Sequence, residues 1–211
     1  MVAASVGVIA AGLWATAASA HVEIDNAEQP VGGLAMLHFL VPDESDTATT
    51  VKVEIAIPAS AVLTSVLPRT AGAWKATTET RQLATPVKTE AGEVSQVVSK
   101  VTFTGGTIAP GQIEQFDIQV GPLPDAVGVS VAFPAVQTYD SGEVVRWIDP
   151  VVEGQAEPAH PTPLVKLTAA SGASGRVNSK DSDILAVAAL AVGALGTLLG
   201  VGAVVGARKR I

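Results

Sequence analysis

Residues 51–57 read Val-Lys-Val-Glu-Ile-Ala-Ile, an unbroken alternation in which every second side chain is a large aliphatic one. Successive side chains of a β-strand point to opposite faces, so this alternation predicts a strand with one buried face. Lys52 and Glu54 then lie on the opposite, solvated face. The residues expected on the buried face are Val51, Val53, Ile55 and Ile57.

The same period of two recurs along the middle of the chain, and turn signals such as Pro42-Asp43, Gly105-Gly106 and Ser141-Gly142 separate the repeats. Many short strands with frequent turns are typical of an all-β fold. We therefore expect a two-sheet sandwich of immunoglobulin-like or cupredoxin-like type. The predicted strands cover residues 34–41, 51–57, 74–80, 94–103, 116–120, 129–133 and 144–148.

The first 20 residues are expected to be a signal peptide. Residues 6–18 are apolar, and Ala18-Ser19-Ala20 places small side chains at the two positions that signal peptidase reads. Cleavage after Ala20 leaves His21 as the first residue of the mature protein. An uncleaved anchor or a buried segment is the alternative interpretation.

The C-terminal part predicts a membrane anchor. Residues 184–207 contain no charged side chain and exceed the length of about 20 apolar residues that crosses a bilayer. Residues 208–211 follow with three basic side chains, which favour the cytoplasmic side. The protein is thus expected in the cell membrane as a single-pass protein, with a domain at residues 21–168 outside and a flexible linker at residues 169–183.

Charge and composition narrow the possible ligands. Residues 21–175 contain 8 Lys and Arg against 18 Asp and Glu, a net charge of −10, which argues against nucleic-acid binding and is compatible with cations. The chain has no cysteine, so it has neither disulfides nor thiolates for Cu(I) or structural zinc. Nucleophile, phosphate-loop and dinucleotide motifs are missing, and we expect no enzyme activity.

A histidine at the mature N-terminus has chemistry that an internal histidine lacks. The α-amine and imidazole Nδ1 of His21 close a six-membered chelate ring around a metal, and both groups release protons near neutral pH. Two nitrogens suit Cu(II), and a carboxylate adds an oxygen donor. The amino-terminal copper motif with histidine third is excluded, because Glu23 stands there. A histidine that follows the cleavage site by accident is the alternative.

The mature chain resembles the YcnI-like family of exported copper-associated domains, which are often anchored by a C-terminal helix. The similarity extends over residues 21–167 and rests on an ordered set of short motifs. These are Ala20-His-Val-Glu-Ile24, Val41-Pro-Asp-Glu44, Val53-Glu-Ile-Ala-Ile-Pro58, Gly72-Ala-Trp74, Pro110-Gly111, Tyr139-Asp-Ser-Gly-Glu-Val-Val-Arg-Trp147 and His160-Pro-Thr-Pro163.

The resemblance implies a single-histidine brace, in which the terminal amine and the ring of the first histidine hold copper together with a glutamate. On this basis His21 is the bracing residue and Glu44 the carboxylate ligand, with Asp43 a weaker candidate. Trp147 matches the nearby tryptophan. Its ring is expected to cover one side of the metal and its indole N–H to donate to a ligand oxygen.

For the remaining candidate residues we expect structural roles rather than metal binding. We expect His38 to be a satisfied core histidine and Trp74 to be a core or rim aromatic. His160 is expected to be exposed near the linker, with an added ligand or a link between domains as the alternative. Glu23 and Asp25 are expected to be solvated strand carboxylates, with a role in supporting the metal ligands as the alternative.

The function these observations favour is extracytoplasmic Cu(II) binding for copper homeostasis or trafficking. The expected partners are the copper ion, the membrane, and a copper transporter or an exported copper-receiving protein. Two alternatives stay open. One is a copper-dependent oxidative enzyme, for which no second histidine is clearly placed, and the other is a surface interaction domain without a metal.

Overall fold

The computed structural model describes residues 21–152 and 154–170, and all regular structure in these ranges is β-strand. The all-β prediction is thereby confirmed. The predicted signal peptide, membrane helix and basic tail lie outside the described residues, as does most of the predicted linker. Within the ranges described, no helix is long and apolar enough to cross a membrane.

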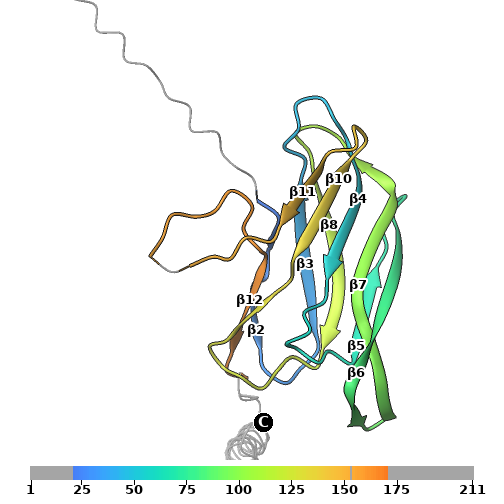
Figure 1. Cartoon of the computed structure of the whole chain (residues 1–211), viewed down its shortest axis with the longest axis vertical. Helices are drawn as coiled ribbons and strands as arrows, with labels where there is room; N and C mark the ends of the chain where they lie inside the picture. The colour runs from blue at the N-terminus through green and yellow to red at the C-terminus, as the bar shows by residue number, and fades with distance from the viewer. Residues whose placement is uncertain (1–20, 153, 171–211) are drawn as a thin grey trace, which may run out of the picture. The chain divides into compact units, whose positions relative to one another are not determined.

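The strands form three sheets, with the orders β1-β3-β8-β5, β11-β10-β4-β7-β6 and β2-β12-β9 (Figure 1). All pairs are antiparallel except β2 with β12. In chain order the strands are β1 (Glu23–Ile24), β2 (Glu28–Pro30), β3 (Ala35–Pro42), β4 (Thr50–Ala56), β5 (Ser65–Arg69), β6 (Lys75–Thr89), β7 (Gly92–Ile108), β8 (Ile113–Gly121), β9 (Ser130–Ala132), β10 (Ala135–Tyr139), β11 (Val144–Trp147) and β12 (Leu164–Thr168).

The two larger sheets make a sandwich. Phe103 of β7 packs on Phe116 of β8 with ring centroids 4.7 Å apart, and Trp74 meets Phe116 edge-on at 4.9 Å. Trp74 is buried, so the core reading of this residue is confirmed. Its indole lies so close to Gly106 that a Cβ there would come within 2.4 Å of the ring, and only glycine fits.

Strand β4 shows how far the alternation in the sequence is followed. Val53 and Ile55 are buried between β10 and β7, and Ile57 is buried just beyond the strand. Val51 is only half-buried, contrary to the prediction. It is the extra residue of a bulge, because β10 pairs Thr138 with Lys52 and the next residue with Thr50. The bulge reverses the alternation and turns Thr50 into the core.

The described residues share one main hydrophobic core. Most of their buried apolar residues form one cluster that begins at Val22 and ends at Leu167, and Ala48, Val97 and Tyr139 are buried outside it. The described part of the predicted linker adds no residue to this cluster. A domain with its own hydrophobic core is able to fold by itself, so residues 21–170 are a suitable unit for solution experiments.

Candidate metal centre

The pairing of β1 with β3 fixes the position of His21, the residue predicted to follow the cleavage site. Glu23 pairs with Leu40 and Ile24 with Phe39 in an antiparallel ladder. Continuing this register places His21 beside Pro42, the last residue of β3. Buried Val22 anchors the start of the chain in the core. His21 therefore lies at the end of the sheet from which the loop carrying Glu44 leaves.

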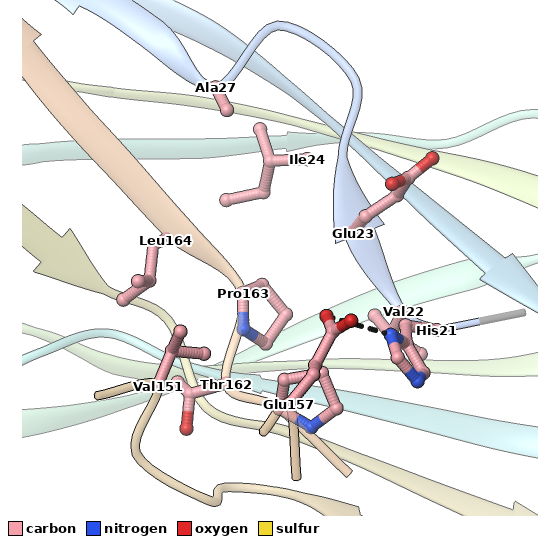
Figure 2. Close-up of a pocket in the computed structure, with 11 residues that line it drawn as sticks. His21, Val22, Glu23, Ile24, Ala27, Val151, Glu157, Thr162, Pro163 and Leu164 are labelled. Atoms are coloured by element: carbon pink, nitrogen blue, oxygen red, sulfur yellow. Dashed lines mark ion pairs between the residues drawn. The ribbon is translucent and has the colours of Figure 1, made fainter. Parts of the chain in front are cut away.

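His21 contributes to an open hollow of about 220 Å³, here called the His21 hollow (Figure 2). Its imidazole Nδ1 lies 3.3 Å from Oε1 of Glu157, and the two side chains point toward each other. The histidine side chain is only 20% exposed. The hollow is lined by His21, Val22, Glu23, Ile24, Ala27, Val151, Glu157, Pro161, Thr162, Pro163 and Leu164.

Glu44 lies elsewhere, in a second hollow of about 260 Å³, here called the Glu44 hollow. Its side chain is exposed and is not part of the lining of the His21 hollow. The structure thus places the two predicted ligands at one end of the domain but in different hollows. The Glu44 hollow is lined by Glu44, Ser45, Tyr139, Glu143, Val145 and His160.

Trp147 connects the two hollows. Its ring centroid lies 5.9 Å from that of His21, with the planes inclined at 59°, and 5.1 Å from that of His160 in an edge-on contact. The indole is fully buried. The predicted proximity of Trp147 to His21 is therefore present, and the tryptophan also backs a second histidine.

The indole N–H of Trp147 is used inside the protein. Nε1 donates to Oε1 of Gln137 at 3.2 Å, and the amide of Gln137 donates to the backbone oxygen of Pro42 and to the hydroxyl of Thr50. The expectation that this N–H donates to a ligand oxygen is not met, because Gln137 takes it. The sequence analysis missed Gln137, because it predicted no strand at this position and nothing nearby in the sequence indicated a buried amide.

Asp43 ends this buried polar chain. Its carboxylate accepts hydrogen bonds from the hydroxyl of Thr50 at 2.9 Å and from the backbone N–H groups of Thr50 and Ser45. A carboxylate with three such donors is occupied in holding the loop. The chain Asp43–Thr50–Gln137–Trp147 thus fixes the loop after β3 and leaves the neighbouring Glu44 outside.

The lining of the Glu44 hollow carries acidic side chains, Glu44 and Glu143. Burial raises the pKa of the Tyr139 hydroxyl, and the charges of Asp43, Glu44 and Glu143 raise it further against a hydrogen bond with the backbone of Glu44. Anionic side chains that disfavour ionisation of a nearby phenol also attract cations.

His160 differs from its prediction. It is half-buried against Trp147 rather than exposed, because the chain returns here toward β12. Its Nδ1 is buried and has no hydrogen-bond partner in the described part of the chain. Buried polar atoms in native proteins nearly always have partners, so this nitrogen is suited to a ligand or a water.

His38 lies outside both hollows. Its Nδ1 is 2.8 Å from Oδ1 of Asp117, directly across the β3–β8 ladder, and its side chain is 31% exposed. His38 is thus satisfied, but on the outer face of its sheet and not in the core. Burial works to raise the pKa of Asp117, but hydrogen bonds from His38 and Gln115 and the charge of Arg69 outweigh it and lower that pKa.

The donors present fit a cupric ion only in part. Among residues 21–152 and 154–170, no three His, Cys, Asp or Glu side chains are grouped closely enough to hold a metal ion. The nitrogen of His21 and the oxygen of Glu157 do face one another, and nitrogen with oxygen is a donor set that suits Cu(II). The predicted cleavage after Ala20 would add a third donor here, the α-amine of His21.

Comparison with known proteins supports the fold. Residues 21–167 match the family described as "Domain of unknown function (DUF1775)". Among curated proteins, none is significantly similar to the chain. A solved structure of an uncharacterized protein from Nocardia farcinica, described as having an immunoglobulin-like fold, is 32% identical. That match covers 70% of this chain and 98% of the other, with a TM-score of 0.56. The predicted immunoglobulin-like sandwich is thereby confirmed.

Proposed function

The chain belongs to the DUF1775 family, the domain that YcnI-like proteins carry, and from this membership we propose that it captures Cu(II) outside the membrane. The observation that carries the proposal is the setting of His21. Its ring is held between the indole of Trp147 and a carboxylate, with Nδ1 toward that carboxylate. Nδ1 is the nitrogen that a terminal histidine uses for chelation.

Processing after Ala20 is the step that makes the site. It converts the backbone nitrogen of His21 into a primary amine, and this amine and Nδ1 then bind one cupric ion as a chelate. Buried Val22 and the β1–β3 pairing keep the new terminus from fraying. A fixed terminus lowers the entropy that metal binding costs.

Glu44 is the proposed carboxylate ligand. It follows β3 directly, at the end of the sheet where His21 lies, and its side chain is exposed and free to turn. Asp43 is unsuited to this role because its oxygens hold the loop. Trp147 forms the apolar back of the site and restricts water there.

The role proposed is binding and transfer, not catalysis. The domain would hold copper for homeostasis or for delivery to a transporter or an exported copper-receiving protein. The proposed anchor at residues 184–207 would keep the ion close to the membrane surface. The net charge of −10 over residues 21–175 favours cations at this surface.

Isothermal titration with Cu(II) tests the proposal on two proteins, residues 21–170 beginning at His21 and the same domain with Ala20 retained. The extra residue turns the amine into an amide and destroys the chelate but leaves every side chain in place. We expect tight 1:1 binding for the first protein and weak binding for the second. Equal affinity of the two proteins would refute the brace.

A further inference from the structure

We infer that Glu157, on the loop between β11 and β12, is a copper ligand beside His21, so that metal binding ties this loop to the N-terminus. The inference rests on the proposed function and extends it to a residue that the resemblance does not assign. It is carried by the contact that the structure places between the carboxylate of Glu157 and the chelating nitrogen of His21.

The distance between the two donor atoms fits a shared metal. Ligands bonded at about 2.0–2.1 Å and set at right angles around one ion lie about 2.8–3.0 Å apart. Nδ1 of His21 and Oε1 of Glu157 lie 3.3 Å apart, so an adjustment of about half an ångström brings both within bonding distance of one ion. Glu44, in contrast, lines a different hollow.

The loop is fixed at its base and adjustable where Glu157 lies. The backbone N–H of Asp149 donates to the carbonyl of His160, and the carbonyl of Asp149 accepts from the N–H and hydroxyl of Thr162. These bonds close the loop beside the His21 hollow. The side chain of Glu157 is 64% exposed, and Pro158 restricts the backbone of Glu157 to extended conformations.

The charge of the His21 hollow also favours a cation. The described residues that line it include two carboxylates, Glu23 and Glu157, and neither lysine nor arginine. The contact of His21 with an exposed glutamate contributes little to stability by itself. The carboxylate therefore gains more from a divalent ion than from the histidine alone. Two nitrogens of His21 with oxygens of Glu44 and Glu157 would supply the mixed nitrogen and oxygen donors that suit Cu(II).

The test measures Cu(II) affinity, by competition with a chelator, for residues 21–170 and for the Glu157→Gln variant. Glu90→Gln, in the exposed β6–β7 turn, is the matched control for loss of one charge. We expect Glu157→Gln to weaken binding about tenfold to a hundredfold, as carboxylates around metal sites do, and Glu90→Gln to leave it unchanged. Electron paramagnetic resonance of the 1:1 Cu(II) complex should change in the first variant only.

Two outcomes separate this inference from the proposed function. If the unsubstituted domain binds copper tightly and Glu157→Gln leaves affinity and spectrum unchanged, Glu157 is no ligand but the brace stands. If the domain ignores Cu(II), both fail. Hydrogen exchange is an independent readout: Cu(II) should slow amide exchange at residues 154–160 in the parent but not in Glu157→Gln. Equal slowing in both proteins would also overturn the inference.

Discussion

Two histidines of this domain each face a carboxylate, and the structure holds the two pairs in different ways. His38 and Asp117 are direct cross-strand neighbours, and Gln115 and Arg69 also contact the carboxylate. His21 and Glu157 come from the start of the domain and from a loop, and the side chain of Glu157 has no other polar partner among the described residues. The His38–Asp117 pair is held by neighbours in its sheet. The His21–Glu157 pair has fewer neighbours, and at the proposed cleaved N-terminus it would retain donors for a ligand.

The sharpest test of this comparison replaces each histidine in turn. His21→Ala removes one arm of the proposed chelate, so Cu(II) affinity should fall by at least about a hundredfold, equivalent to about 2.8 kcal/mol. His38→Ala should leave the affinity unchanged, because its partners belong to the β3–β8 ladder. Competition titrations of both variants measure this. A comparable loss in His38→Ala would mean that the two pairs are not functionally distinct.

The second test removes the support behind His21. Gln137→Ala leaves the indole N–H of Trp147, the hydroxyl of Thr50 and the carbonyl of Pro42 without their buried partner. Such losses should lower the free energy of unfolding by about 2 kcal/mol. Urea denaturation of the metal-free domain measures the effect. Gln96→Ala, at an exposed position of β7, is the control and should stay within about 0.5 kcal/mol. Equal stability of the two variants would show that the buried chain Asp43–Thr50–Gln137–Trp147 does not contribute to the free energy of unfolding.

The sequence could predict those parts of the fold that depend on local periodicity. Val53 and Ile55 are buried as the alternation indicates, and Trp74 is in the core. The position of Val51 could not be predicted, because the bulge there turns Thr50 inward to meet Asp43 and Gln137. Asp43 and Gln137 are not next to Thr50 in the sequence, so a pattern of neighbouring residues cannot predict these contacts.

The residues of the candidate site also differ in whether the sequence could predict them. The predicted signal cleavage indicates His21, and the order of motifs indicates Glu44 and Trp147. Glu157 was missed because it is far from His21 in the chain, in a loop without periodicity, and only the folded loop brings them together. The burial of His160 against Trp147 depends on the same loop. Proline at positions 158, 161 and 163 is the one sequence sign that this segment is constrained.

The third test concerns the His38–Asp117 pair and measures how protein stability depends on pH in acid. The pKa of Asp117 lies below its ordinary value of 3.8 in the folded protein, so the carboxylate stabilises the fold above that pH. This stability is lost as the pH falls through the lower folded value. Asp117→Asn should therefore flatten the decline of unfolding free energy as the pH falls below about 4, by about 0.5–1 kcal/mol. Urea denaturation at several pH values measures it, and an unchanged acid limb would contradict the assigned cause.

The smallest expected effect concerns Arg69 and shows whether Arg69 or His38 holds the carboxylate of Asp117 in place. The guanidinium of Arg69 lies 3.3 Å from Oδ2 of Asp117, but its side chain is 70% exposed, whereas His38 contacts Oδ1 at 2.8 Å. Exposed ion pairs contribute about 0–1 kcal/mol and are screened by salt. Arg69→Ala should therefore lower stability by about 0.3 kcal/mol in dilute buffer and by less in 1 M salt. A loss above about 1 kcal/mol that persists in salt would mean that the arginine, and not the cross-strand histidine, holds this carboxylate in place.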